Sequence, residues 1–312
     1  MINRYITENG RLETTENHLH GSWISVIAPT NEELADLAEE LSLDEDILRA
    51  ALDTEERSRL EVDEAFTMVL VNIPYISVQA DRELYDTMPL SIILTKDTAV
   101  TVCLQDSPVL RQFATGKVRD FNTGMKSRFV LQMLYRIASL YLVYLRSIDR
   151  RSDEIEKTLH KSTRNEELLE LLKLEKSLLY FTTSLRANEV VLEKLLRVDA
   201  IKKYPEDEEL LEDVIVENKQ AIEMAGIYSG VLNELMNAFS SVISNTLNMV
   251  MKVLAIITIV MSVPTMIFSA YGMNVAGIPL ATSPYGFAIV LGISVLALII
   301  AVIFLSKMRI FK

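Results

Sequence analysis

A long stretch near the C-terminus carries no charge, and it constrains this chain more than any other feature. Between Val253 and Ser306 there is no Asp, Glu, Lys, Arg or His, whereas the 312-residue chain contains 31 Lys and Arg and 43 Asp and Glu. Because a charged side chain is strongly disfavoured in the hydrocarbon core of a bilayer, a charge-free segment of this length indicates membrane-spanning helices.

Turn-forming residues divide the uncharged stretch into two spans. Residues 272–284 include two glycines, two prolines and an asparagine, which favour a loop. The flanking segments, residues 253–271 and 285–306, have 19 and 22 residues, close to the roughly 20 that cross a bilayer core. We therefore expect a transmembrane hairpin of two helices joined by a loop.

The basic residues beside the two spans predict their orientation. Lys252 precedes the first span, and Lys307, Arg309 and Lys312 follow the second, which agrees with the excess of Lys and Arg on the cytoplasmic side of membrane proteins. The N-terminal segment has no apolar core of the kind found in signal peptides. We expect a multi-pass protein of the cytoplasmic membrane, with both termini in the cytoplasm and the loop outside.

The composition of the rest of the chain excludes several classes of protein. Residues 1–252 contain 28 Lys and Arg against 43 Asp and Glu, a formal charge of −15, which is a poor match for nucleic acid. The single cysteine, Cys103, excludes a disulfide framework, and His18, His20 and His160 lack the spacing of a metal site. Since there is also no phosphate loop or nucleophile elbow, we do not expect an enzyme.

The first part of the chain combines strand and helix patterns. Apolar, β-branched runs predict strands at residues 23–28, 64–71 and 90–104, the last folding into a hairpin at Lys96 and Asp97. Thr30 and Glu33 have the spacing of a capping box, which predicts a helix over residues 32–41. A sheet covered by helices is the expected result.

Helical periodicity replaces this mixed pattern from about Ser127 onward. It predicts helices at residues 127–161 and 165–197, a break at Lys203 to Pro205, and a third helix from Glu206 to about Ala270. Pro205 and the acidic run after it suit a helix N-terminus. At 1.5 Å per residue the third helix would be roughly 100 Å long, so we expect it to connect two compartments.

The predicted fold is an α+β cytoplasmic domain followed by long helices and a C-terminal two-helix transmembrane hairpin. Its regions are a cytoplasmic α/β domain (1–126), a stalk of long helices (127–252), the first transmembrane helix (253–271), the external loop (272–284), the second transmembrane helix (285–306) and a basic tail (307–312).

Small and polar side chains recur along the first span and the residues before it, at alternating steps of three and four. Two interpretations are open: the small residues allow helices to pack closely, or copies of the helix surround an aqueous path. The second interpretation requires a homo-oligomer, because two spans cannot enclose a pore. The stripe consists of Ser241, Ser244, Asn248, Met251, Ala255, Thr258, Ser262, Thr265 and Ser269.

The motif Gly272-Met273-Asn274 follows the stripe, after Tyr271. With the uninterrupted helix, the acidic domain and the basic tail, it resembles the CorA family of divalent-cation channels. Further matches are Ser244-Asn245, Asn248, Met251 to Leu254 and Pro264-Thr265. The resemblance covers the architecture of the whole chain and implies a homopentamer with a funnel-shaped cytoplasmic domain, a pore lined by the first span, and transport of Mg²⁺, Co²⁺ and Ni²⁺.

The resemblance also implies a role for the motif. Gly272, Met273 and Asn274 would form a selectivity filter, where the Asn274 side chains present a ring of amide oxygens to hydrated Mg²⁺. Because Mg²⁺ gives up its inner-shell water reluctantly, neutral oxygens can hold the hydrated ion through outer-shell hydrogen bonds. Alternatively, Asn274 is only a turn residue in the left-handed region after Gly272.

The family pattern places Met251 and Leu254 at a hydrophobic constriction, which can block ions by dewetting. We expect Lys252 to point outward, because a cation in the lumen would repel Mg²⁺. The complete predicted pore lining is Asn248, Met251, Leu254, Ala255, Thr258, Ser262, Thr265 and Ser269.

The resemblance further implies a regulatory cation between neighbouring subunits. Asp213 matches the position of an acidic residue near the start of the long helix, and Asp81, Glu83 and Asp86 are candidates for the opposing carboxylate. Five soluble parts would bring together a formal charge of −75, and such charges repel unless cations bridge them. Cytoplasmic Mg²⁺ is therefore expected to hold the channel closed.

Two alternatives remain at this point. One is a zinc transporter, because Gly277-Ile278-Pro279 is similar to the zinc-transporting branch of the superfamily. Residues 275–284 also contain no acidic residue, whereas many relatives place a carboxylate there to attract cations. A membrane-anchored helical sensor or scaffold is the other possibility, but a scaffold needs neither the polar stripe nor the asparagine.

Overall fold

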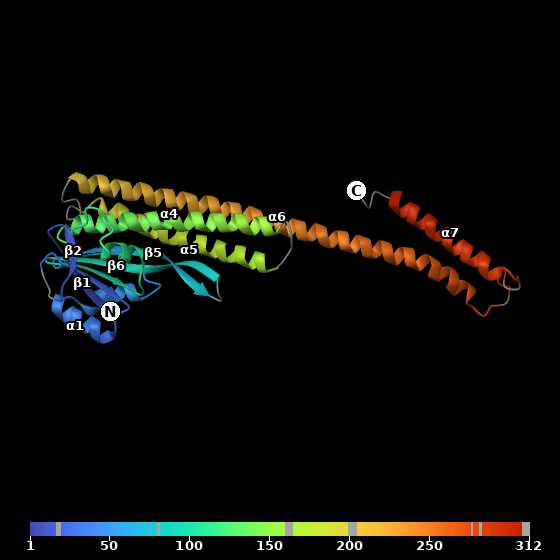
Figure 1. The fold of residues 1–312 in the computed structure, drawn as a ribbon, viewed down its shortest axis with the longest axis horizontal. Coiled ribbons are helices and arrows are strands. Elements are labelled where there is room, and N and C mark those ends of the chain that lie inside the picture. Colours follow the sequence, from blue (N-terminus) through green and yellow to red (C-terminus); the bar gives the residue numbers. More distant parts are fainter. Residues whose placement is uncertain are drawn as a thin grey trace. The chain divides into compact units, whose positions relative to one another are not determined.

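The computed structural model describes residues 1–16, 20–79, 82–159, 165–198, 205–275, 277–280 and 283–307. The chain forms two compact units, Met1–Met236 and Asn237–Lys312. The first contains a sheet with helices on it, and the second contains the end of the longest helix and a further apolar helix (Figure 1).

A mixed sheet forms the centre of the first unit. In the described part of the chain it has seven strands in the order β2-β1-β3-β7-β6-β5-β4. β3 and β7 are parallel, and the other neighbours are antiparallel. The strands are β1 (Ile2–Glu8), β2 (Arg11–Thr14), β3 (Trp23–Ile27), β4 (Arg59–Val62), β5 (Phe66–Gln79), β6 (Arg82–Thr95) and β7 (Ala99–Cys103).

The strands with apolar runs were predicted, and the more exposed strands were not. β3 and the β6–β7 hairpin are confirmed, although β5 and β6 extend several residues beyond the expected bounds. β1, β2 and β4 were missed because their side chains are half-buried or exposed. Such strands lack the apolar alternation that marks a strand buried on one face.

One face of the sheet is covered by α1 (Asn31–Leu41), α2 (Glu45–Arg49) and the 3-10 helix η1 (Ala50–Leu52). Leu34, Leu37 and Leu48 pack in one apolar core with Met68 and Leu70 of β5. The capping box at α1 is confirmed, since the Glu33 backbone N–H donates to Thr30 Oγ1 at 3.2 Å and the Thr30 N–H donates to Glu33 Oε2 at 2.9 Å.

The long helices cover the opposite face (Figure 1). α4 (Lys126–Leu159) and α5 (Asn165–Leu195) contact β5 and β6, and α3 (Pro108–Ala114) contacts α4. α6 (Pro205–Tyr271) is joined to both by hydrogen bonds: Asn218 Nδ2 donates to the Leu185 carbonyl at 3.1 Å, and Ser139 Oγ donates to Glu217 at 3.1 Å. The predicted helices are confirmed to within two residues over the described part of the chain, but Pro205, which was predicted within the break, is the first residue of α6. Residues 160–161 and 203–204 of these predictions lie outside the described residues.

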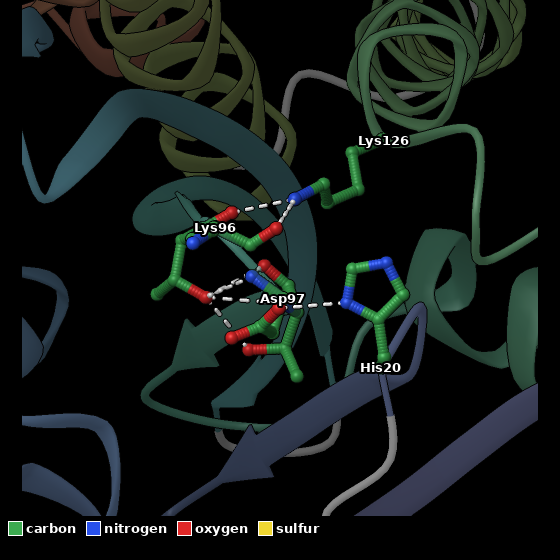
Figure 2. Close-up of polar contacts among 6 residues, drawn as sticks. His20, Lys96, Asp97 and Lys126 are labelled. Atoms are coloured by element: carbon green, nitrogen blue, oxygen red, sulfur yellow. Dashed lines mark hydrogen bonds and ion pairs between the residues drawn. The ribbon is translucent and has the colours of Figure 1, made fainter.

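Lys126 attaches the start of α4 to the β6–β7 turn (Figure 2). Its ammonium group donates to the carbonyl oxygens of Thr95 and Lys96, both at 2.6 Å. Asp97 of the same turn is hydrogen-bonded to His20, whose ring atom Nδ1 lies 2.7 Å from Asp97 Oδ1. This hydrogen bond holds the pKa of Asp97 below its usual value. The turn that the sequence predicts at Lys96 and Asp97 therefore also positions a helix.

Asn188 of α5 completes the hydrogen bonding of β5 just beyond Leu70, where the pairing of β5 with β4 stops. Arg59, the first residue of β4, pairs with Leu70, so the backbone of Asn72 has no neighbouring strand on that side. The Asn72 N–H donates to Asn188 Oδ1 at 2.8 Å, and Asn188 Nδ2 donates to the Asn72 carbonyl at 2.7 Å. Tyr141 donates to the same carbonyl at 3.0 Å.

Two prolines are accommodated in this extension of β5 and β6. Pro89 lies opposite Asn72, and Pro74 lies two residues beyond Asn72 on β5. The Asn72 N–H and C=O point away from β6, toward Asn188. In an antiparallel pair the backbone nitrogen of Pro74, two residues along, then also faces away from β6, and that of Pro89, opposite Asn72, faces away from β5. A missing N–H at either position therefore removes no bond between the two strands.

We expect Asn188→Ala to lower the midpoint of thermal unfolding of the full-length protein by roughly 3–10 °C, because the buried Asn72 N–H loses its acceptor at a cost of about 1–3 kcal/mol. The measurement is a thermal melt in detergent. Arg186→Ala, on the exposed face of the same helix, is the control and should change the midpoint by less than about 2 °C. Equal midpoints for Asn188→Ala and the control would contradict this role.

Candidate functional site

Two helices are long and apolar enough to cross a membrane. They are α6, within Glu206–Tyr271, and α7 (Gly286–Lys307). In the single chain none of the most apolar segment of α6 is buried, and 17% of the corresponding segment of α7 is buried. Pro264 lies inside α6 without ending it, although its missing N–H leaves the Val260 carbonyl without an intrahelical donor.

The polar stripe of α6 is accessible in the single chain. Its members are exposed, except for Ser262, which is half-buried. Three of its hydroxyl groups donate to carbonyls of their own helix: Thr258 to Leu254 at 2.8 Å, Ser262 to Ile259 at 2.8 Å and Thr265 to Met261 at 2.8 Å. Because each hydroxyl hydrogen is used inside the helix, the oxygen lone pairs remain free to accept hydrogen bonds.

A different face of α6 is covered within the second unit. Ile256, Val260, Val263 and Ile267 are half-buried, and their spacing of three or four residues places them in one row. At 3.6 residues per turn this row is turned roughly 150° away from the mean direction of the stripe between residues 251 and 269. α7 is the other helix of this unit, and its buried residues Gly286, Val290 and Ser294 also form one row.

The motif after the stripe begins at the last turn of α6. The Gly272 N–H donates to the carbonyls of Phe268, at 2.9 Å, and Ser269, at 3.2 Å. Asn274 is exposed and is not among the described residues with a positive φ, so the interpretation of Asn274 as a left-handed turn residue is wrong. The left-handed positions are instead Gly277, with φ of 97°, and Leu280, with φ of 70°.

Gly286 allows α7 to begin against the loop. A Cβ atom on this residue would lie far inside van der Waals contact with the Leu280 carbonyl oxygen. Sequence reasoning assigned no role to Gly286, and the only available signal was a glycine at the start of an apolar segment. The structure shows that its lack of a side chain is required by a residue six positions earlier.

The predicted regulatory acids are not gathered into a metal site within one chain. Asp213 is exposed on α6 and Asp86 lies on β6, whereas Asp81 and the side chain of Glu83 lie outside the described residues. Among the described residues, no group of three or more His, Cys, Asp or Glu is arranged to hold a metal ion. A site that joins Asp213 to two or more such ligands therefore needs a second subunit or the residues not described.

Asp86 already has a partner on the neighbouring strand. It pairs with Tyr75 across β5 and β6. Burial raises the pKa of Tyr75 above its usual value, and the charge of Asp86 and its hydrogen bond to Tyr75 raise this pKa further. Asp86 also accepts a hydrogen bond from the Thr87 N–H at 2.7 Å. These contacts use part of the hydrogen-bonding capacity of the Asp86 carboxylate.

An acidic α/β unit that continues into two apolar helices, one with an accessible polar stripe, fits the class of membrane transport proteins. A protein-family model described as CorA-like Mg²⁺ transporter protein matches residues 19–307. The chain belongs to this family, and it is a divalent-cation transporter.

Individual relatives agree with this assignment. The cobalt/magnesium transport protein CorA of Methanocaldococcus jannaschii is 30% identical over 289 residues, which cover 90% of this chain and 88% of that protein. The complete structure of the CorA magnesium transporter from the same organism has a TM-score of 0.81 at 26% identity, covering 97% of this chain and 96% of that chain.

The zinc alternative has weaker support. The cytoplasmic domain of ZntB from Vibrio parahaemolyticus RIMD 2210633 has a TM-score of 0.58 at 10% identity, covering 78% of this chain and 98% of that chain. At this identity the similarity shows a shared fold alone. The sensor or scaffold interpretation is excluded by the family assignment.

We expect Gly286→Ala to lower the midpoint of thermal unfolding by several degrees, because the backbone at Leu280 has to move at a cost of about 1–3 kcal/mol. Gly292→Ala is the matched control on the same helix, since a Cβ atom there meets no atom within 4 Å. The measurement is a thermal melt of both variants in the same detergent. If Gly286→Ala melts as the control does, the contact with Leu280 is not rigid.

Proposed function

We propose that this protein is a homopentameric channel that takes up Mg²⁺ across the cytoplasmic membrane and also conducts Co²⁺ and Ni²⁺. Both termini lie in the cytoplasm, and the loop after Asn274 lies outside. The observation that carries the proposal is the position of the polar stripe on α6, away from the row that is covered within the second unit. Copies of α6 can therefore turn the stripe toward a common axis while the covered row faces away from that axis.

The chemistry of the stripe suits a hydrated cation. The inner-shell waters of Mg²⁺ point their hydrogens outward and therefore need acceptors. The hydroxyls of Thr258, Ser262 and Thr265 donate to their own helix, so their oxygens are acceptors on the lumen side. Such a surface guides the hydrated ion without removing its water, which Mg²⁺ gives up reluctantly.

The proposed filter is a ring formed by Gly272, Met273 and Asn274. Asn274 is exposed immediately after the end of α6, and its amide oxygen would accept hydrogen bonds from the hydrated ion. A ring of neutral oxygens binds more weakly than a ring of carboxylates, so it allows faster release. Residues 275–284 contain no acidic residue, and capture of the ion therefore depends on this ring.

The proposed gate is the apolar part of the pore lining. Met251 and Leu254 are 57% and 56% exposed in the single chain, which is unfavourable in water but suitable in an assembled bundle. A narrow ring of such side chains excludes ions by dewetting, and a small rotation or splaying of the helices opens it. Asn248 lies one turn before this constriction and provides a polar group on its cytoplasmic side.

Assembly is supported by apolar side chains that one chain leaves uncovered. Val216, Ile227 and Val231 of α6 are 63%, 62% and 51% exposed, and their spacing places them on one face of the helix. Because exposed apolar residues in a row indicate an interaction surface, we assign this face to contacts between copies of α6. The pentameric number comes from the family resemblance.

We expect Asn274→Ala to reduce Mg²⁺ flux into liposomes containing the purified protein at least about tenfold, because the ring loses the acceptors that hold the hydrated ion. Asn233→Ala is the control, since Asn233 is exposed on α6 before the spans and its amide donates to its own helix at Ser229. Flux of Mg²⁺, Co²⁺, Ni²⁺ and Zn²⁺ is compared for both variants. Undiminished Mg²⁺ flux through Asn274→Ala would refute the filter, and a clear preference for Zn²⁺ in the parent would favour the zinc alternative.

Regulation by cytoplasmic Mg²⁺ forms part of the same proposal. Asp213 is exposed beside the buried Val214 on α6, so its carboxylate is accessible to a cation at the surface of the first unit. Residues 1–252 carry a formal charge of −15, and neighbouring copies repel one another unless cations bridge them. Bound Mg²⁺ would hold the copies together in the closed state, with Asp81, Glu83 and Asp86 as candidates for the opposing carboxylate.

We expect Asp213→Lys to raise the internal Mg²⁺ concentration required for half-inhibition of flux at least about tenfold, because a lysine ammonium group repels the regulatory cation. Glu212→Lys makes the same change of charge at the adjacent exposed position and should leave the inhibition closer to that of the parent. The measurement is Mg²⁺ flux from liposomes loaded with increasing Mg²⁺. Unchanged inhibition in Asp213→Lys would remove this residue from the mechanism.

A further inference from the structure

A cavity of about 420 Å³ opens between β6, α4 and α5 of the first unit. It lies outside the proposed filter, gate and regulatory residues. It is lined by Leu84, Tyr85, Ser147, Arg150, Arg151, Glu154, Glu170, Lys173, Leu174 and Ser177.

The rim of this cavity carries positive charge that is only partly neutralised. Arg151 binds both acids of the rim, donating to Glu154 at 2.9 Å and to Glu170 at 2.6 Å. Arg150 and Lys173 are exposed, and no salt bridge to either is present among the described residues. The rim of a cavity in this acidic protein therefore presents a guanidinium and an ammonium group to solvent.

The floor of the cavity contains an unsatisfied hydroxyl group. Ser177 is 0% exposed, and its Oγ has no hydrogen-bond partner in the described structure. Buried hydroxyls are nearly always paired, so an unpaired hydroxyl in the wall of a cavity indicates a place for a ligand atom. Ser177 follows Lys173 by four residues on α5, which places both side chains on the same face of the helix.

The antiparallel packing of α4 and α5 brings the two uncommitted cations to one opening. Arg151 faces Glu170 at one level, and the rings of Tyr141 and Phe181 meet at another, with centroids 5.0 Å apart. In this register Arg150 lies within about two residues, or roughly 3 Å along the helix axis, of the level of Lys173. Tyr85 of β6, whose ring centroid lies 5.5 Å from that of Tyr144, forms the third wall.

We propose that this cavity binds a small phosphate-bearing anion. A guanidinium group forms paired hydrogen bonds to phosphate oxygens, a lysine ammonium adds a second charge, and the Ser177 hydroxyl can donate to a third oxygen. The volume lies within the range of small-molecule sites and exceeds the needs of a single water or chloride. Phosphate satisfies all three groups, because it carries several acceptor oxygens and up to two negative charges near neutral pH.

The test is calorimetric titration of the full-length protein in detergent with inorganic phosphate, pyrophosphate and ATP, each without added Mg²⁺. We expect saturable binding of at least one of these probes, weakened at least about tenfold in the double variant Arg150→Gln/Lys173→Gln. Lys219→Gln removes one positive charge from an exposed position of α6 and should bind as the parent does. Equal affinity in the double variant and the parent overturns the proposal, as does a parent that binds neither these soluble probes nor vesicles that contain phosphatidic acid.

Ser177→Ala separates binding from folding. Removal of an unpaired buried hydroxyl should leave the thermal midpoint unchanged or raise it, while phosphate binding weakens about threefold to tenfold. Unchanged affinity in this variant would overturn the role of Ser177.

Vesicles of phosphatidylcholine with and without phosphatidic acid form a separate arm, and binding that depends on Arg150 and Lys173 in this arm alone would identify a lipid headgroup as the source of the phosphate.

Discussion

The dry interior of a bilayer sets the main constraint on this protein, because backbone and hydroxyl groups placed there have no water to bind. α6 and α7 satisfy most of their backbone groups within each helix, and the Val260 carbonyl opposite Pro264 is an exception. The hydroxyls of Thr258, Ser262 and Thr265 use their hydrogens in the same way, on carbonyls of α6. A helix that satisfies its own hydroxyl donors can carry polar oxygens through the membrane, and those oxygens keep lone pairs that can accept further hydrogen bonds. In the proposed channel the waters of a hydrated cation would donate these bonds.

In the first unit, the long helices must be held against the sheet although residues 1–252 carry a formal charge of −15. α4 and α5 are attached to the sheet by Lys126, by the Asn72–Asn188 pair and by aromatic contacts around Phe181. The start of α6 is attached to α4 through Ser127, which donates to the buried Asp207 at 2.9 Å. The helix that is attached here also carries the polar stripe, since α6 is continuous from Pro205 to Tyr271.

Most elements could be predicted because their signals are local. The capping box of Thr30 and Glu33, the apolar run of β3 and the periodicity of α4 to α6 each lie within a few turns or residues of sequence. β5 was predicted to end at Val71, where its apolar run is interrupted by Asn72. In the structure the strand continues to Gln79, since Asn188, 116 residues away, provides the bonds that β4 does not. β1, β2 and β4 were missed for the complementary reason, because half-exposed strands depend on pairing with distant partners.

The sequence alone determined the two spans, the polar stripe between Ser241 and Ser269 and the motif after it, because charge, periodicity and spacing are properties of contiguous residues. Only the tertiary structure decided which face of α6 is covered, why Gly286 cannot have a side chain, and that Arg150, Lys173 and Ser177 border one cavity. These facts depend on which segments meet in space, and no local pattern records that pairing. The same distinction applies to the predicted regulatory acids: Asp213 was selected by its position in the sequence, whereas the structure decides that no group of three metal-binding side chains forms among the described residues of one chain.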